Sequence, residues 1–128
     1  MIDWTKIKHF KRTEFKDPEK ISPVLVWQLD RVRVLAKVRM TITSSYRPGP
    51  RFWITRAGKR KSSAHRVDNK GIYHGVDVRT ASSKARMKII AAALEAGFVR
   101  IGVYDHHVHL DVARKGFAQG VMWWEKST

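Results

Sequence analysis

The residues best suited to chemistry lie in one short run near the C-terminus, Tyr104–Asp111. In an extended strand, alternate side chains share a face. One face of this run would then carry two carboxylates and two imidazoles, from Asp105, His107, His109 and Asp111. The other face would carry Val108 and Leu110, as a half-buried strand requires. Because ordinary packing does not need two imidazoles between two carboxylates, the run predicts metal binding or proton transfer.

The composition predicts one small domain. The chain has 128 residues, 43% of them hydrophobic, which is enough for a single core. It has no cysteine, so any metal would be held by histidine and carboxylate groups. The N-terminus is polar and no apolar run approaches the ~18 residues of a membrane span, so we expect neither a signal peptide nor membrane insertion. We predict a monomeric domain over 1–128, with an N-terminal arm at 1–21 packed on it.

The net charge of +15 predicts attraction to polyanions, which include nucleic acid, anionic lipid and the anionic polymers of a bacterial envelope. The excess is concentrated in residues 51–66, which carry six cations, two aromatic residues and no carboxylate. Two interpretations of this segment stay open. It is either a solvated loop or a loop that faces a polyanion or the substrate.

The first half of the chain predicts one helix and one strand. Ser22 is a suitable N-cap and Pro23 a suitable first helical residue, so we expect a helix over 23–36. Four residues at helical spacing should form its buried face: Leu25, Leu29, Val32 and Ala36. Residues 39–43 alternate as a strand. A cluster of proline and glycine then begins a long basic surface loop, placed at 47–70.

The second half predicts two more strands and a second helix. Residues 71–79 alternate as a strand with Asp77 on its polar face. N-cap candidates between Thr80 and Ser83, and a stop at Gly97, predict a helix of about 14 residues. Its buried face should carry Met87, Ile90 and Leu94.

A further strand over 98–104 should lead straight into the histidine run, followed by a short tail. In that tail, Trp123 and Trp124 are expected to close the core. This order of elements predicts an α+β domain with two principal helices and a small, mainly antiparallel sheet.

Three separate motifs resemble those of the zinc metallopeptidase family that comprises D-alanyl-D-alanine carboxypeptidases and phage L-alanyl-D-glutamate endopeptidases. They are Ser63-Ala64-His65, His74-Gly75-Val76-Asp77 and His107-Val108-His109. Residues 9–15, 41–47 and 97–111 are similar to further segments of the family, in particular of its short phage-type members. The resemblance therefore spans most of the chain.

The resemblance implies a set of site residues. One zinc ion would be bound by His65, Asp77 and His109. Arg47 and Ser63 would contact the substrate, and Arg47 or His107 would stabilise the charge that develops on its carbonyl oxygen. Asp111, two positions after the last ligand, would orient the site as a hydrogen-bond acceptor.

Two features depart from the family pattern. The connection from His65 to Asp77 is longer than in most relatives, and the extra residues would lie within 66–73, where an insertion costs little. His74 is an alternative ligand, but it would lie on the opposite strand face from Asp77. The second departure concerns the catalytic carboxylate, since His106 occupies its usual position.

In an extended strand, Asp105 shares a face with His107 and His109, whereas His106 points to the other face. Asp105 is therefore the predicted general base. Asp111 is the competing carboxylate.

The predicted function is a zinc-dependent peptidoglycan peptidase of the endolysin type, hydrolysing a stem-peptide amide bond. Such an enzyme would stay in the host cytoplasm until lysis, and its positive charge would attract it to anionic envelope polymers. The alternative is a non-catalytic basic phage protein, structural or nucleic-acid-binding, that retains the fold. A metal nuclease is disfavoured because the sequence has no acidic cluster suited to hard metal ions.

Overall fold

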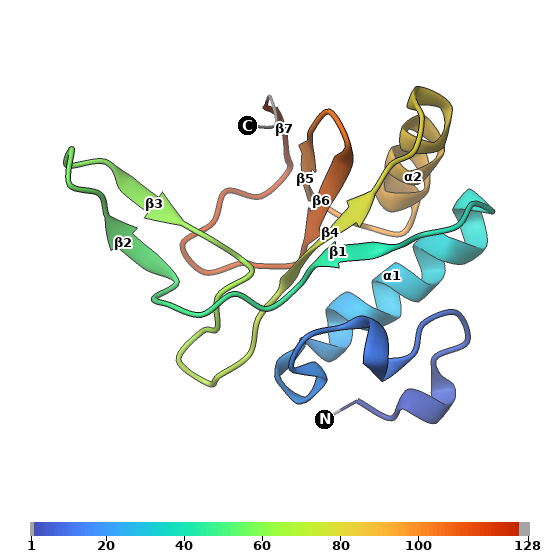
Figure 1. Cartoon of the computed structure of the whole chain (residues 1–128), viewed down its shortest axis with the longest axis horizontal. Coiled ribbons are helices and arrows are strands. Elements are labelled where there is room, and N and C mark those ends of the chain that lie inside the picture. Colours follow the sequence, from blue (N-terminus) through green and yellow to red (C-terminus); the bar gives the residue numbers. More distant parts are fainter. Residues whose placement is uncertain (1, 126–128) are drawn as a thin grey trace.

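Two helices and seven strands make up the regular structure of residues 2–125, which the computed structural model describes (Figure 1). Short 3-10 turns precede them at Trp4–Lys6, Arg12–Glu14 and Pro18–Lys20. The helices are α1 (Pro23–Ala36) and α2 (Ser83–Glu95). The strands are β1 (Ile42–Ser44), β2 (Phe52–Ile54), β3 (Arg60–Ser62), β4 (Gly75–Arg79), β5 (Arg100–Val103), β6 (His107–Asp111) and β7 (Val121–Trp124).

Five strands form one sheet in the order β1-β4-β6-β5-β7. Every pair is antiparallel except β5 with β7. The predicted α+β domain with a mainly antiparallel sheet and two principal helices is confirmed. One face of the sheet is buried in the core, with side chains from Val76, Val78, Ile101, Val103, Val108 and Leu110. The opposite face is free to carry polar groups.

Helix α1 has the predicted bounds because its end signals are local. The hydroxyl of Ser22 accepts a hydrogen bond from the backbone N–H of Leu25 at 3.4 Å, and Pro23 occupies the first turn. The helix ends at Lys37, which adopts a left-handed conformation. The predicted core residues are buried: Leu25, Leu29, Val32 and Ala36.

Helix α2 also has the predicted ends, but two of the three residues predicted for its buried face are exposed. Ser82 caps it and Gly97 follows it with a positive φ of 96°. The buried residues are Ile89, Ala92 and Ala93. Of the predicted residues, Ile90 is partly buried against the core, whereas Met87 is 73% and Leu94 55% exposed. Helix α2 packs against α1, and small alanine side chains allow this close approach. The spacing of the large apolar residues alone therefore did not identify the buried face of α2.

The N-terminal arm contributes to the same core. Ile7, Phe10 and Phe15 are buried in it. Asp30 on α1 accepts hydrogen bonds from two consecutive backbone N–H groups of the arm, the closer at 2.8 Å from His9. These contacts give the arm both an apolar and a polar attachment to α1.

Two expectations about the middle of the chain need correction. The first strand covers Ile42–Ser44 rather than 39–43. The segment 47–70 is not a loop throughout, because β2 and β3 pair within it as an antiparallel hairpin. Cross-strand pairing between the two strands supplies regular structure that their short apolar pattern did not signal. Among the described residues, neither helix is long and apolar enough to cross a membrane.

Candidate metal centre

The register of the strands aligns one row of residues across the polar face of the sheet. His109 on β6 lies opposite Asp77 on β4 and opposite Gly102 on β5. Gly102 in turn lies beside Trp123 on β7. A Cβ atom at Gly102 would lie 2.6 Å from the Trp123 ring, so glycine leaves room for the indole to approach His109. The row brings a carboxylate, an imidazole and an indole together.

His65 reaches this row from the loop before β4. Its backbone N–H donates to the hydroxyl of Ser63 at 3.3 Å, which fixes a tight turn. The absence of a side chain at Gly75 makes the approach possible. A Cβ atom there would lie 2.9 Å from Cβ of Ala64 and 3.0 Å from Cε1 of His109. Close packing over a glycine thus places a loop histidine against two strands.

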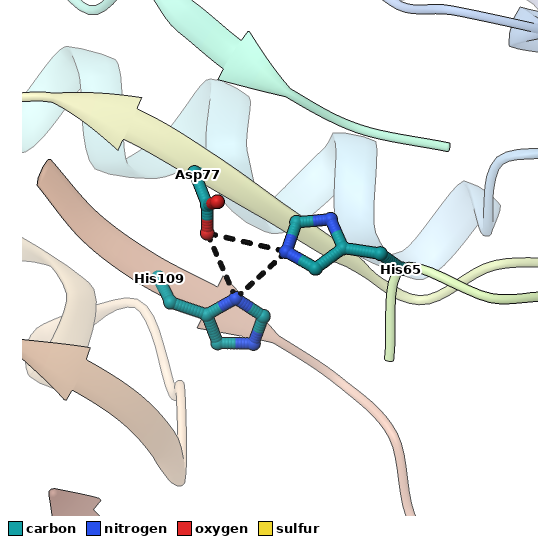
Figure 2. Close-up of side chains that lie close together, drawn as sticks. All are labelled: His65, Asp77 and His109. Carbon is teal, nitrogen blue, oxygen red and sulfur yellow. Dashed lines mark hydrogen bonds and ion pairs between the residues drawn. The ribbon is translucent and has the colours of Figure 1, made fainter. Parts of the chain in front are cut away.

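Figure 2 shows three buried side chains that converge on one point. Nε2 of His65 lies 3.2 Å from Oδ1 of Asp77 and 3.2 Å from Nδ1 of His109. That Nδ1 lies 3.0 Å from the same carboxylate oxygen. These ligand atoms all lie within 4.8 Å of one another, so the group could hold a metal ion.

The outer nitrogen of each imidazole has a hydrogen-bond acceptor that fixes the tautomer. Nδ1 of His65 donates to the backbone carbonyl of Ser45 at 2.7 Å. Nε2 of His109 donates to Oδ2 of Asp111 at 2.6 Å. The inner nitrogens therefore direct lone pairs toward each other and toward Asp77. Three acceptors at this distance repel one another unless a proton or a cation lies among them.

Burial and hydrogen bonding shift the pKa values of the three side chains in different directions. Burial lowers the pKa of His65. Burial also opposes charge on His109, but its hydrogen bonds to Asp111 and Asp77 outweigh this and raise its pKa to about 8. Burial would raise the pKa of Asp77, but its bonds to the two histidines hold it well below the usual value. The raised pKa favours a proton on His109 when no cation is bound, and a metal would displace this proton.

The second oxygen of Asp77 faces the other groups that the sequence placed at the site. Nη2 of Arg47 donates to Oδ2 of Asp77 at 3.1 Å, and its side chain is 49% exposed. Nε2 of His107 lies 3.8 Å from the same oxygen, and its ring stacks on Tyr104 with centroids 4.3 Å apart. Arg47 and His107 therefore border the three-residue cluster on its open side.

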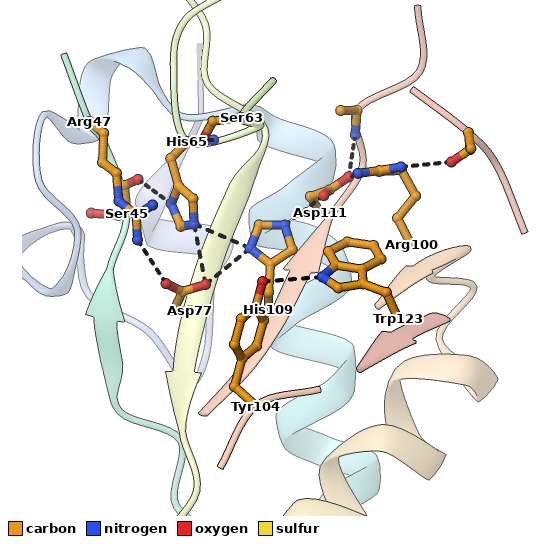
Figure 3. A network of polar contacts seen from close by, with 12 residues as sticks. Ser45, Arg47, Ser63, His65, Asp77, Arg100, Tyr104, His109, Asp111 and Trp123 are labelled. Carbon is orange, nitrogen blue, oxygen red and sulfur yellow. Dashed lines mark hydrogen bonds and ion pairs between the residues drawn. The ribbon is translucent and has the colours of Figure 1, made fainter. Parts of the chain in front are cut away.

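Asp111 lies on the side of His109 away from Asp77, as Figure 3 shows. Its side chain is fully buried, and Oδ1 accepts a hydrogen bond from Nε of Arg100 at 2.7 Å while Oδ2 faces His109. Burial would raise the pKa of Asp111, but these two partners lower it. The contact with His109 is the one expected of a residue that orients a ligand.

The expected position of Asp105 is wrong. Strand β6 begins at His107, so Asp105 and His106 lie in the exposed turn between β5 and β6. The backbone N–H of Tyr104 bonds to the carbonyl of His107 at 3.0 Å and closes this turn. Asp105 consequently does not share a strand face with His109, and it does not line the cleft around the cluster.

His74, the alternative ligand, is engaged elsewhere. Its Nε2 lies 2.9 Å from Oδ2 of Asp68. Asp68 also accepts backbone N–H groups from Lys70 and Ile72, which makes the connection before β4 a compact turn. The long connection between the first two ligands is thus closed by its own hydrogen bonds.

Comparison with family models, curated proteins and solved structures finds no match to this chain. The geometry of the site and the motifs in the sequence therefore carry the functional argument. The cluster opens into a cleft of about 550 Å³. Its lining includes the three cluster residues together with Arg47, Ser62, Ser63, Arg100, Tyr104, His107, Trp123 and Glu125.

Five of these lining residues were missed as site residues: Ser62, Arg100, Tyr104, Trp123 and Glu125. Trp123 was expected to close the core, but its indole N–H donates to the hydroxyl of Tyr104 at 3.1 Å beside His109. Trp124 is 70% exposed and does not close the core either. Glu125 directly follows β7, and it contributes to the rise in the pKa of Tyr104, of which burial is the main cause. The parallel pairing of β7 with β5 brings this tail to the site, and no local pattern signalled that pairing.

Proposed function

We propose that this chain is a zinc-dependent peptidase that hydrolyses an amide bond in the stem peptides of bacterial peptidoglycan. The observation that carries the proposal is the convergence of three inward-facing acceptor atoms from His65, Asp77 and His109. The motifs that contain these residues are the ones that resemble the peptidase family. The open cleft beside the cluster supports access for a peptide.

The ligand set suits zinc. Two histidines and one carboxylate, with room for a further ligand, are typical of catalytic zinc sites, whereas structural sites are fully closed by protein ligands. A zinc ion held by these residues would supply a Lewis acid and lower the pKa of a water molecule to ~7. Ser45 and Asp111 support the two imidazoles in the tautomers that binding requires.

We assign the proton acceptor to Glu125 in place of Asp105. Asp77 belongs to the cluster, and Asp111 is fully buried with both oxygens engaged. Asp105 lies in an exposed turn and does not line the cleft. Glu125 is the other carboxylate that lines the cleft among the described residues. Its carboxylate would take a proton from the attacking water and return it to the leaving amine.

The groups at the open side of the cleft would handle negative charge. Arg47 keeps N–H groups free for a substrate carboxylate or for the carbonyl oxygen as it becomes anionic. His107 lies on the same side and can donate through Nε2. Ser63 adds a hydroxyl at the cleft wall. Stem peptides carry free carboxylates, which match this cationic edge.

Metal analysis and defined substrates would test the proposal. The purified chain should contain about one zinc, and a chelator should abolish the release of peptide fragments until zinc is restored. Mass spectrometry of digested stem peptides would assign the bond as L-alanyl-D-glutamate or terminal D-alanyl-D-alanine. A chain that binds no zinc, cleaves no stem peptide and shifts labelled DNA would instead support the basic non-catalytic alternative.

A further inference from the structure

The β2–β3 hairpin projects away from the five-stranded sheet, as Figure 1 shows at the end of the molecule opposite α2. Its strands are Phe52–Ile54 and Arg60–Ser62, and a short turn joins them. Hydrogen bonds within the turn hold it, since Thr55 N–H donates to the carbonyl of Lys59 at 2.8 Å.

The six cations of residues 51–66 fall into two groups. Arg51 and Arg66 attach the base of the hairpin to the domain. The guanidinium of Arg66 lies 3.9 Å from the centre of the Trp53 ring and donates to the carbonyl of Pro50. The guanidinium of Arg51 lies 4.7 Å from the centre of the Phe117 ring. These two cations have a structural use.

The other four cations lie toward the tip and are exposed: Arg56, Lys59, Arg60 and Lys61. None of them pairs with a carboxylate among the described residues 2–125. Four positive charges within six residues repel one another, and no ion pair with a described carboxylate offsets this repulsion. Their concentration at one place therefore indicates an anionic partner.

The base of the hairpin adjoins the metal centre. Ser62 ends β3 and Ser63 follows it, and both line the cleft that contains His65. A polymer bound along the hairpin would therefore be led directly to the cluster. The strand that carries Arg60 and Lys61 therefore runs into the wall of the cleft at Ser62 and Ser63.

The hairpin is poorly suited to the bases of single-stranded nucleic acid. Its two aromatic rings are already occupied, Trp53 by Arg66 and Phe52 by Phe117 at 5.2 Å between ring centroids. Two apolar side chains of the hairpin are exposed, the aliphatic Ile54 at 68% and Phe52 at 50%. Stacking platforms are a regular feature of proteins that bind single strands, but here a guanidinium covers Trp53, and Phe52 packs on Phe117 and is only half exposed. A polymer with repeated charges and no bases fits better.

We propose that the β2–β3 hairpin binds a phosphate-bearing anionic polymer of the cell wall, and so holds the metal centre beside its peptide substrate. This inference rests on the proposed peptidase function for the role of binding, although the binding itself can be measured alone. The affinity is localised in the four tip cations and is not a general result of the +15 charge.

Two variants with equal changes in net charge would test this localisation. In the tip variant, Arg56, Lys59, Arg60 and Lys61 are replaced by Gln. In the control variant, four exposed cations elsewhere are replaced by Gln: Lys8, Arg31, Lys84 and Lys88. Thermal unfolding establishes that both are folded. A third variant, Arg56→Lys with Arg60→Lys, keeps the charge of the tip.

Binding to poly(glycerol phosphate) would be measured by titration calorimetry at low and high salt. We expect the tip variant to lose at least about tenfold in affinity and most of its salt dependence. The control variant and the charge-keeping variant should stay within about threefold of the unmodified chain. Hydrolysis of a small soluble stem peptide should be unchanged in all three, while lysis of intact walls should fall in the tip variant alone.

Equal losses of affinity in the tip and control variants would overturn the inference in favour of a general charge effect. Tighter binding of duplex DNA than of poly(glycerol phosphate) would overturn it in favour of a nucleic-acid partner. If the unmodified chain fails to hydrolyse any stem peptide yet binds the polymer through the tip, the peptidase proposal fails and the hairpin assignment stands.

Discussion

The candidate metal centre and the β2–β3 hairpin differ in the burial of their polar side chains and in whether those side chains have partners. At the metal centre, His65, Asp77 and His109 are buried, and each outer polar atom has a partner within hydrogen-bond distance. At the hairpin tip the charges are exposed and have no carboxylate partner in the described chain. Buried polar groups must be satisfied by the fold, whereas exposed ones are satisfied by water until a partner replaces it. The difference supports the two proposals, which assign a preorganised metal site to the buried cluster and an adaptable binding role to the hairpin.

The largest effect is expected at the candidate metal centre, from His109→Ala. It removes one of the three converging atoms and leaves Asp111 buried beside an empty space, so we expect zinc binding and stem-peptide hydrolysis to be abolished. Zinc per chain and peptide release would be measured together. His107→Ala is the matched control, since it should keep the zinc and lose about 10²-fold in turnover. One full zinc in His109→Ala would refute the ligand assignment.

The next largest effect is expected from Glu125→Gln. Loss of the proton acceptor should lower turnover by about 10²–10⁴-fold while zinc content stays unchanged. Asp105→Asn is the control, because Asp105 lies in an exposed turn outside the cleft. The opposite outcome, with Asp105→Asn inactive and Glu125→Gln active, would return the role of base to Asp105.

Asp111→Asn would test the support behind the cluster. The amide keeps the shape but removes the charge that holds Nε2 of His109 and pairs with Arg100. We expect zinc affinity to fall by about 10–100-fold, measured by competition with a chromogenic chelator. Asp68→Asn breaks a similar pair with His74 away from the cluster and should leave the affinity unchanged. Equal affinities in both variants would show that Asp111 does not tune the metal.

The pH dependence should differ between metal binding and folding. Zinc must displace the proton of His109, whose pKa is raised to about 8, so affinity should rise with pH up to that value by up to about tenfold per unit. The same raised pKa stabilises the metal-free fold below the ordinary value of 6.5, and this contribution is lost as the pH rises through about 8.

Urea unfolding of the metal-free chain at pH 6 and pH 9 would measure this contribution. His109→Gln, which cannot titrate, should lose that part of the pH dependence. An identical pH dependence in both proteins would contradict the assignment of the proton to His109.

The smallest effect is expected at the hairpin. Ile54 is 68% exposed, so Ile54→Ala should change the free energy of unfolding by no more than about 0.5 kcal/mol. Leu29→Ala, in the fully buried face of α1, should cost about 2–5 kcal/mol. Chemical denaturation would measure both. A cost at Ile54 similar to that at Leu29 would mean that the hairpin is part of the core and not an arm.

Local signals in the sequence predicted part of this molecule accurately. The bounds of α1 followed from Ser22 and Pro23, because a cap and a first-turn proline act within one helical turn. The end of α2 followed from Gly97 for the same reason. Its buried face did not, since the choice between two apolar stripes depends on the surface that α1 presents.

The site residues also include some that the sequence predicted correctly and one that it did not. The motifs that resemble the peptidase family predicted His65, Asp77 and His109 as ligands of one ion, and the fold brings the three side chains into contact. Alternation along the histidine run placed Asp105 on their face, and this failed because strand β6 begins only at His107. The position of a turn is fixed by pairing with the neighbouring strand, which one segment does not contain.

By itself, the sequence determined the class of fold, the three candidate ligands and the excess of positive charge. Only the tertiary structure decided that Glu125 and Trp123 reach the cleft, that Asp105 does not, and that the basic segment forms a projecting hairpin. The physical reason is the distance along the chain over which each kind of interaction acts. Caps, periodicity and charge act over a few residues, whereas strand register and parallel pairing join residues that are far apart in the chain.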